Sequence, residues 1–558
     1  MLALRAIGGE IAHISGTRFL SYGITTQAMK TGDKRRVKRQ KRAFETFKAG
    51  LGTNEEVLSF DIRAFRNHIS SKVSDNGSQG PEEQEDRSVD PLPERFSEIE
   101  VNISSISSTG DGLGICKDSD QVYVVPFTAP GDVVKAKVIR HVEDLAYTLT
   151  DFLRVIQPGP RRDDSLIRCP YFASCAGCQL QMLPYEDQLK HKKTIVENAY
   201  LNFSSLAPEA MPAVLETTGS PMQYGYRTKL TPHFDAPPRS DVKEAQRNGE
   251  SIFKSVPPIG FMVKGTRRTL DIEDCPIGTD AVRRGITIER ERVAKEISKY
   301  KRGATLLLRE STTRKGTAGK PFQSREAPKS DDVSGPGTKF SEVKTCITDS
   351  NATATEYIDK FVFYNTAGAF FQNNNSILPV FTAYIRSCIK HHNPSSQPID
   401  YLIDAYCGSG LFTVALSALF KASLGIDISE PSVAAAERNA KANNVKNARF
   451  ITADAARLFE SVEFDADSTA VVIDPPRKGC DEQFLSQLLA FAPKRVVYVS
   501  CNVHTQARDV GVLVQGREGV RYEIESLRGF DFFPQTGHVE GVAVLSRVEG
   551  DVTASAGQ

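Results

Sequence analysis

Val471–Gly479 (VVIDPPRKG) and Arg495–Asn502 (RVVYVSCN) share one construction, an apolar β-rich run that stops abruptly at polar residues. Such a run is typical of a buried parallel strand whose carboxyl end opens at a binding edge. A third run, Phe533–Glu540 (FPQTGHVE), follows downstream. Because ligands of open α/β sheets lie just beyond the carboxyl ends of the strands, we expect the three runs to meet at one crevice. That crevice would contain two acids and a thiol, Asp474, Glu540 and Cys501.

These three side chains suit covalent catalysis at an electron-poor double bond. A thiolate can add to such a bond and activate the neighbouring carbon, from which a carboxylate can then remove a proton. The alternative is that Cys501 is an ordinary buried strand cysteine, since free cysteine is among the most buried residue types. The presence of all three runs in this order favours the catalytic interpretation.

At these runs the sequence resembles the RNA 5-methyluridine methyltransferases, the tRNA and rRNA (uracil-5-)-methyltransferase family. The resemblance extends from Phe96 to Arg547 with interruptions. It implies that Cys501 attacks C6 of uracil, that S-adenosylmethionine supplies the methyl group, and that Glu540 removes the C5 proton. It also implies that Asp474 lies beside the methionine moiety of the cofactor and hydrogen-bonds the target base.

The resemblance further implies a role for Arg477 in holding a flipped nucleotide or its phosphate. Base flipping is expected because C5 and C6 of a stacked uracil are poorly accessible to a thiolate. Thr505 and Arg508-Asp509 continue the family's run after the nucleophile. His538 either takes part in catalysis or only shapes the turn.

The composition is that of an ordinary globular protein. With 558 residues the chain is too long for one core, and about three or four units are expected. The formal net charge of +1 means that a nucleic-acid surface has to be local. No stretch approaches the apolar length that spans a bilayer, so no membrane partner is expected, and no obligate protein partner is evident. Ten cysteines without an extracellular pattern favour an intracellular, reducing compartment and use in metal binding or catalysis.

Residues 1–95 are predicted to be a disordered extension, first basic and then acidic. Met1–Met29 resembles a mitochondrial transit peptide, and Lys34–Arg42 (KRRVKRQKR) is a basic run of the nuclear-localisation or RNA-tail kind. A solvated tail explains both equally well. Ser71–Arg95 has the composition of a linker. The expected compartment is therefore the mitochondrion, the nucleus or both.

Residues 96–158 are predicted to form a small antiparallel barrel. Glu98–Val101, Val122–Val125 and Val133–Val138 are short β-rich runs separated by Gly- and Pro-containing turns. The pattern resembles the TRAM domain, an OB-like RNA-binding module. A purely structural barrel is the alternative. Four side chains could contact phosphate if they are exposed: Lys135, Lys137, Arg140 and His141.

Four cysteines have the spacing of a metal site. Cys169, Cys175 and Cys178 form a C-x5-C-x2-C cluster, and Cys275 follows downstream. Four thiolates suit either zinc or an iron–sulfur cluster, and the spacing alone does not choose between them. The rRNA branch of the family carries a [4Fe-4S] cluster on this arrangement, so the resemblance favours iron–sulfur. Zinc and free thiols without a metal are the alternatives.

Residues 159–364 are predicted to be a central β-rich (α+β) RNA-binding domain. Tyr224–Leu230 and Ile259–Gly265 resemble family segments that line the RNA path, where aromatic and cationic side chains can stack on bases and neutralise phosphates. Either run could instead be an ordinary strand with a solvated face. Residues 312–344, rich in Gly, Ser, Pro and Lys, are expected to be a flexible insertion. The candidate RNA contacts here are Arg227, Lys229 and Phe261, which join Arg477.

Residues 365–550 are predicted to be a doubly wound, Rossmann-like methyltransferase domain, followed by a tail at 551–558. Tyr401–Gly410 (YLIDAYCGSG) is a buried strand that runs into a glycine turn, and Ser423–Asp427 is a second strand that ends in an acid. Such an acid can accept hydrogen bonds from ribose hydroxyls. Together with the family's F-x-Q-x-N run, these features indicate the cofactor-binding residues Gln372, Tyr406, Gly408, Gly410, Asp427, Asp454 and Asp474.

The sequence thus predicts an S-adenosylmethionine-dependent enzyme that methylates uracil C5 in RNA. The long basic extension is typical of the eukaryotic, fungal-type tRNA members, so the T-loop uridine of tRNA is the expected target. The cysteine cluster favours the rRNA branch, which is the alternative. A non-catalytic RNA-binding or RNA-folding protein is the second alternative, but it predicts loss of Cys501 or Glu540, and both are present.

Overall fold

A computed structural model describes residues 52–75, 92–116, 121–316, 340–390, 398–453, 458–459 and 462–548, and all of them belong to one compact unit. The two address-like segments before Gly52 and the tail at 551–558 lie outside the described residues, as does the cofactor candidate Asp454. In the described ranges no helix combines the length and the apolar character needed to cross a membrane.

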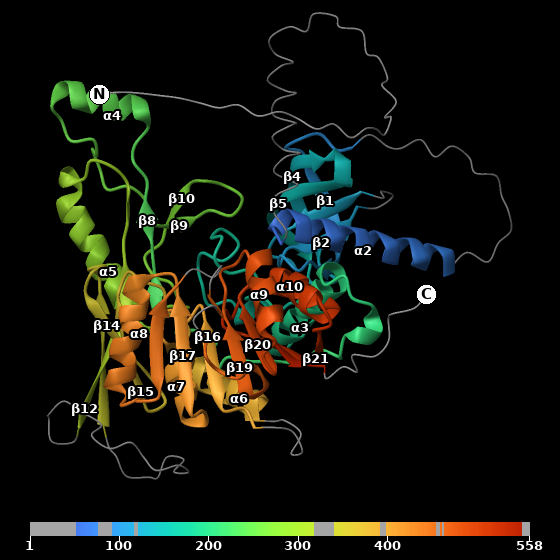
Figure 1. Ribbon diagram of the computed structural model, residues 1–558. Helices are drawn as coiled ribbons and strands as arrows, with labels where there is room; N and C mark the ends of the chain where they lie inside the picture. The colour runs from blue at the N-terminus through green and yellow to red at the C-terminus, as the bar shows by residue number, and fades with distance from the viewer. Residues whose placement is uncertain are drawn as a thin grey trace, which may run out of the picture. The chain divides into compact units, whose positions relative to one another are not determined.

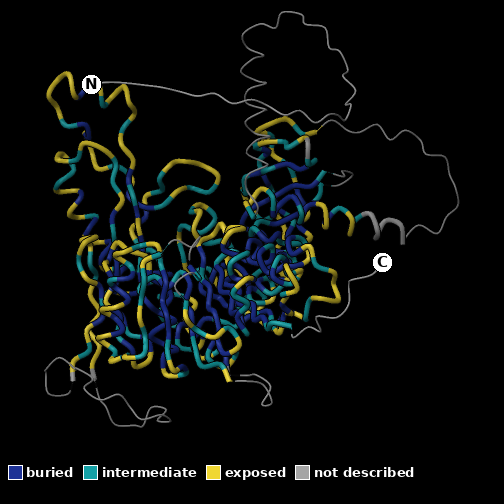
Figure 2. The backbone as a smooth tube through the Cα atoms, viewed as in Figure 1, coloured by how far each residue is buried: buried dark blue, intermediate teal, exposed yellow. Residues whose placement is uncertain are grey.

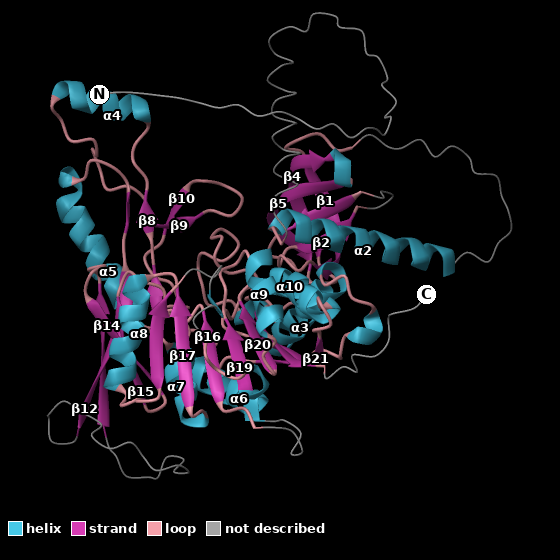
Figure 3. Cartoon of the chain, viewed as in Figure 1, coloured by secondary structure: helices cyan, strands magenta, loops and turns pink. Residues whose placement is uncertain are grey.

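An eight-stranded sheet forms the centre of the C-terminal domain (Figures 1 and 3). Five adjacent strands are parallel, and three more extend them on one side: one strand runs antiparallel to both of its neighbours, and the last two are parallel to each other and to the first five. In spatial order the sheet contains β18 (Ala448–Thr452), β17 (Ala422–Asp427), β16 (Tyr401–Ala405), β19 (Thr469–Ile473), β20 (Arg495–Ser500), β22 (Glu540–Arg547), β21 (Tyr522–Phe530) and β6 (Leu215–Thr218). The prediction of a Rossmann-like α/β domain is confirmed.

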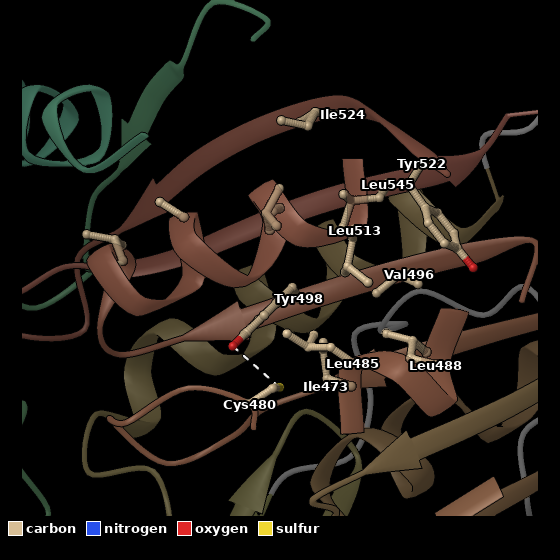
Figure 4. Close-up of a cluster of buried hydrophobic side chains, with 14 of the residues drawn as sticks. Ile473, Cys480, Leu485, Leu488, Val496, Tyr498, Leu513, Tyr522, Ile524 and Leu545 are labelled. Carbon is tan, nitrogen blue, oxygen red and sulfur yellow. Dashed lines mark hydrogen bonds between the residues drawn. The ribbon is translucent and has the colours of Figure 1, made fainter. Parts of the chain in front are cut away.

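Helices cover both faces of this sheet, which explains why its strands are continuously apolar. Val496 and Tyr498 of β20 pack in one buried cluster with α9 and α10, while Val497 and Val499 pack in a second cluster with α6 and α7. Figure 4 shows part of the first cluster, in which Tyr498 lies near Cys480. The helices are α6 (Leu378–Lys390), α7 (Leu411–Leu416), α8 (Glu430–Ala442), α9 (Glu482–Phe491) and α10 (Val503–Gln515).

Two elements of the expected central domain complete the catalytic domain instead. Strand β6 pairs in parallel with β21, where Leu215 faces Arg528. Helix α3 (Tyr185–Phe203) contributes Ile195, Val196 and Tyr200 to the first buried cluster of the sheet. The expected boundary at residue 365 therefore does not separate two structural units, because the sheet recruits strand and helix from earlier in the chain.

A closed five-stranded barrel forms the N-terminal region, as predicted. Its strand order is β1-β2-β3-β5-β4, with β3 and β5 parallel. Alternate side chains such as Val101, Ile103 and Val134 are buried inside it. The strands are β1 (Glu98–Ile106), β2 (Gly112–Ile115), β3 (Val122–Val125), β4 (Val133–Val142) and β5 (Tyr147–Gln157).

Helix α2 (Asn54–Asp75) lies within the range that was expected to be disordered, and that expectation is wrong here. Most of its residues are polar, but a short apolar stripe is buried against other parts of the fold: Val57, Leu58, Ile62 and Phe65. The segment is helical because the packing of this apolar stripe, rather than the helix propensity of its residues, supplies most of the stability of the helix.

The central region contains three small sheets, and Figure 2 shows that its α4 and β9–β10 parts are largely exposed. Strands β12 and β13 pair from Arg309–Ile347 to Gly316–Phe340, so the flanks of the expected flexible insertion are strands. Residues 317–339 are outside the described part. The elements are β7 (Lys229–Leu230), β8 (His233–Phe234), α4 (Arg239–Asn248), β9 (Gly260–Met262), β10 (Thr269–Asp271), α5 (Asp280–Glu296), β11 (Ala304–Thr305), β12 (Leu308–Gly316), β13 (Phe340–Ile347), β14 (Thr353–Ile358) and β15 (Phe361–Thr366).

Candidate active site

Three neighbouring strands bring the predicted catalytic trio to one edge of the sheet. Asp474 follows β19, Cys501 follows β20, and Glu540 is the first residue of β22. Strands β20 and β22 are antiparallel, and Ser500 pairs with Gly541. The end of β20 therefore meets the start of β22, which places the thiol and the second acid side by side. The first acid lies one strand away in parallel register.

The thiol of Cys501 is half-buried, and three charged neighbours affect its pKa. Burial, chiefly, raises its pKa to about 12, and the carboxyls of Glu540 and Asp474 add to that rise. The guanidinium of Arg477 acts in the opposite direction, through its charge and through a hydrogen bond. Because only the thiolate is a strong nucleophile, Arg477 is the described cation that favours the reactive form.

The pKa values of both acids lie above those of ordinary surface carboxyls. Burial raises the pKa of Glu540 well above its ordinary value, and the nearby Asp474 raises it further. Burial and then Asp404 raise the pKa of Asp474 to about 7. A carboxylate whose pKa is raised towards the working pH is a better base than an ordinary surface carboxylate. The site can thus accept a proton from a carbon acid.

Asp404 is a buried acid that raises the pKa of Asp474 and that the sequence reasoning did not single out. It lies on β16 and is fully buried, and its Oδ2 accepts hydrogen bonds from Thr413 N at 2.8 Å and Thr413 Oγ1 at 2.6 Å. Its Oδ1 is buried without a hydrogen-bond partner among the described residues. The available signal was an acid inside an otherwise apolar strand. Burying a carboxyl costs free energy unless hydrogen bonds or a charged partner compensate, so such an acid indicates a specific environment.

Helix α10 holds the loop that carries Arg477. The carbonyl of Arg477 accepts hydrogen bonds from Asn502 Nδ2 at 3.0 Å and Thr505 Oγ1 at 3.1 Å. Further along the loop, Asp509 Oδ2 accepts from Cys480 N at 2.7 Å. Cys501 and Arg477 are therefore parts of one hydrogen-bonded unit, although they lie on different strand ends.

The residues present fit an S-adenosylmethionine. Asp427, at the end of β17, accepts hydrogen bonds from Gly408 N at 3.0 Å and Ser429 N at 2.8 Å, and its oxygens keep free lone pairs for hydroxyl donors. A Cβ on Gly408 would meet nothing within 4 Å among the described residues, so the space beside the turn is open. Gly410 has a φ of +85°, which favours glycine. Tyr406 shares this turn with a φ of +63°. Gln372 is buried in the segment that leads to α6.

The four cysteines converge on one cavity of about 350 Å³. Cys169, Cys175, Cys178 and Cys275 all line it, and burial raises the pKa of each thiol, that of Cys275 to about 12. In the described part of the chain, however, no group of three or more His, Cys, Asp or Glu residues is arranged to hold a metal ion. Four thiols are suitable ligands for a metal, but their sulfur atoms are not arranged as a coordination sphere.

The same cavity contains three of the four RNA candidates. Arg227, Phe261 and Arg477 line it together with His538, so it adjoins the catalytic loops. Lys229 is not among its lining residues and instead donates hydrogen bonds to the carbonyls of Gly368 at 2.9 Å and Ala369 at 3.1 Å. The structure therefore groups a cationic and aromatic surface beside the thiol and gives Lys229 a structural contact.

Comparison with known proteins agrees with this arrangement. Residues 349–548 match the tRNA (Uracil-5-)-methyltransferase family, and residues 94–142 match the TRAM domain. The chain is 47% identical over 463 residues to the tRNA (uracil(54)-C(5))-methyltransferase of Schizosaccharomyces pombe, covering 82% of this chain and 79% of that protein. It is 41% identical over 480 residues to the enzyme of the same name from Saccharomyces cerevisiae, covering 80% and 73%.

One solved structure shares the fold over most of the chain. It is the Pyrococcus abyssi tRNA (uracil-54, C5)-methyltransferase in complex with S-adenosyl-L-homocysteine, with a TM-score of 0.54 and 22% identity. The match covers 80% of this chain and 100% of that one. At this identity the likeness concerns the fold.

Proposed function

Since the chain belongs to the tRNA (uracil-5-)-methyltransferase family, we propose that it methylates C5 of uracil 54 in tRNA with S-adenosylmethionine as the methyl donor. The observation that carries the proposal is the meeting of Cys501, Asp474 and Glu540 at one sheet edge. Such a trio has no use in a protein that only binds or refolds RNA.

We assign the nucleophile to Cys501. Its thiolate sulfur forms a bond to C6 of the flipped uracil while the electron pair of the C5–C6 double bond moves onto the base, which makes C5 electron-rich. Gln372, Asp427 and the Tyr406–Gly410 turn would hold S-adenosylmethionine, which would supply the methyl group that C5 accepts and would leave as S-adenosylhomocysteine. Arg477 stabilises the negative charge that the thiolate carries before it adds.

We assign the base to Glu540. After methylation C5 carries both a methyl group and a proton, and Glu540 takes that proton. The electron pair of the C5–H bond then re-forms the C5–C6 double bond, and the C6–S bond breaks to release Cys501. Asp474, next to both groups, is positioned to hydrogen-bond the base and to keep the pKa of Glu540 high.

Tritium release tests the reaction and the substrate together. The probe is tRNA or rRNA transcript labelled with tritium at C5 of uridine, incubated with S-adenosylmethionine and either wild type or Cys501→Ala. We expect release from tRNA that the variant abolishes. Release from rRNA only would favour the rRNA branch, for which the Cys169–Cys275 set is the supporting observation. No release from either RNA would contradict the proposed chemistry.

The [4Fe-4S] cluster remains a prediction from the sequence. The arrangement of the four thiols does not support it. The four cysteines share a cavity, but among the described residues they are not placed as metal ligands, so no catalytic step is assigned to a cluster. Iron, sulfide and zinc analysis of protein purified without oxygen decides between cluster, zinc and free thiols. Cys175→Ser is the informative variant, because it should remove bound iron or zinc.

We also propose that the N-terminal segments direct the protein to the mitochondrion, the nucleus or both. The support is the composition of Met1–Met29 and of Lys34–Arg42. Fusions of a fluorescent protein to the full chain, with and without each segment, test the proposal by microscopy. An unchanged distribution after both deletions would contradict it.

A further inference from the structure

Helix α2 contacts the turn that carries the nucleophile. One face of the helix packs on the catalytic domain, since Val57 lies in the buried cluster of the sheet and the ring of Phe60 lies 5.0 Å from that of Phe203. Just before the helix, the carbonyl of Gly52 accepts a hydrogen bond from Asn502 Nδ2 at 3.4 Å. Asn502 is the chain neighbour of Cys501, so the segment that leads into the helix contacts the residue next to the reacting thiol.

Another face of α2 packs on the barrel. Leu58, Ile62 and Phe65 are buried in a cluster with side chains of β2, β3 and β5. Between them, the buried Asp61 accepts hydrogen bonds from Ser108 N at 2.7 Å and Ser108 Oγ at 3.0 Å. Ser108 lies in the turn between β1 and β2, and the helix therefore fixes this barrel turn by a buried polar contact.

That barrel turn reaches the loop before Glu540 through Gln179. Gln179 Nε2 donates to Thr109 O at 2.7 Å, and its Oε1 accepts from Gly537 N at 3.1 Å. Its backbone N–H also donates to Gln535 O at 2.8 Å. The approach is close, because a Cβ built on Gly537 would lie 3.1 Å from the Cα of Gly110.

We infer that α2 and Gln179 make the barrel a positioning element of the active site, in addition to any RNA contact. The segment that leads into the helix contacts Asn502 beside the nucleophile, and the chain of hydrogen bonds from Asp61 through Ser108 and Gln179 holds the loop that leads to Glu540. The inference rests on the proposed function. It predicts that the barrel contributes to kcat, because a misplacement of about 1 Å in a catalytic group can slow a reaction by about 100-fold.

The test compares Gln179→Ala and Asp61→Ala with Asn67→Ala, an exposed position on the same helix. Steady-state methyl transfer on full-length tRNA gives kcat and KM. We expect each test variant to lower kcat by about tenfold or more with little change in KM, and the control to match wild type. The double variant should lose less than the product of the two effects, because both residues act on one loop.

A second readout separates the two catalytic steps. RNA that carries 5-fluorouridine at the target cannot lose a C5 proton, so the covalent Cys501 adduct accumulates. Gln179→Ala should form this adduct at the rate of wild type, since it disturbs only the loop of Glu540. Asp61→Ala should slow its formation, because α2 also holds Asn502.

Two results would overturn the inference. One is a raised KM with unchanged kcat, which would make the barrel a binding module alone, and the other is test variants that match Asn67→Ala in every parameter. If Asp61→Ala does not fold, Gln179→Ala decides by itself, because its side chain is only half-buried. The wild-type rate on tRNA and the loss of activity in Cys501→Ala test the proposed function separately.

Discussion

Lys192 and Asp531 form an ion pair of 2.5 Å in which neither side chain is exposed to solvent. The same ammonium donates to Phe533 O at 3.0 Å, and Tyr185 Oη donates to the carboxylate at 2.8 Å. The pair thus anchors the start of the loop that ends at Glu540.

Lys192→Met should destabilise the fold, because it leaves the carboxylate of Asp531 buried without its countercharge. Loss of one partner of a buried pair typically costs about 3–5 kcal/mol in the free energy of unfolding. Urea denaturation measures this change. Lys193→Met, on the same helix but paired with the exposed Glu216, is the matched control and should leave the midpoint unchanged. Equal midpoints for the two variants would contradict the anchoring role.

Glu540→Gln should trap the enzyme on its substrate. The variant can still add Cys501 to C6 and accept the methyl group, but it cannot remove the C5 proton. We expect kcat to fall by about 10²–10⁴-fold and a protein–RNA adduct to appear on denaturing gels. Glu523→Gln, an exposed position on β21, should behave like wild type. A variant that loses activity without any adduct would assign Glu540 to an earlier step.

Arg477→Ala should make Cys501 less reactive even without RNA. The guanidinium lowers the pKa of the thiol, so its removal raises that pKa and reduces the thiolate fraction at a given pH. Alkylation of the peptide that contains Cys501, followed by mass spectrometry, measures the rate. The neighbouring exposed Lys478→Ala serves as control. Faster alkylation in the Arg477 variant would show that access, and not charge, limits the thiol.

Asp404 should make the protein less stable as the pH rises. Burial raises its pKa to about 7, above the ordinary aspartate value of 3.8 that applies to the unfolded chain. Below the lower value both states are protonated, and between the two values only the unfolded state ionises, so the free energy of unfolding falls as the pH rises towards about 7. Between these two pH values the unfolding equilibrium constant of wild type should therefore rise. In Asp404→Asn the rise should be smaller by a factor of at least about ten. If the free energy of unfolding of the variant changed with pH as in wild type, Asp404 would not be the source of the pH dependence.

The local sequence was sufficient to predict two kinds of element. One kind packs against segments that are close in the sequence, and the other is a strand with a continuous apolar run. The strands before Asp474 and Cys501, the glycine turn and the barrel belong to these kinds. Helix α2 was missed because its stripe is short and its partners, such as Tyr147 and Phe203, are distant in the sequence. The Lys192–Asp531 pair spans 339 positions, and nothing in either local sequence distinguishes a buried charge from a surface one.

The pairing of β6 with β21 has a consequence for how the chain folds. Leu215 leaves the ribosome long before Arg528, so the sheet cannot close its edge until nearly the whole chain has been made. Contacts of such large sequence separation slow folding and leave apolar surface transiently uncovered. A fragment that starts at residue 365 would lack both β6 and α3, and its bare β21 edge would be a template for aggregation. Nascent chains of this protein therefore expose the apolar face of the unfinished sheet until the last strands emerge.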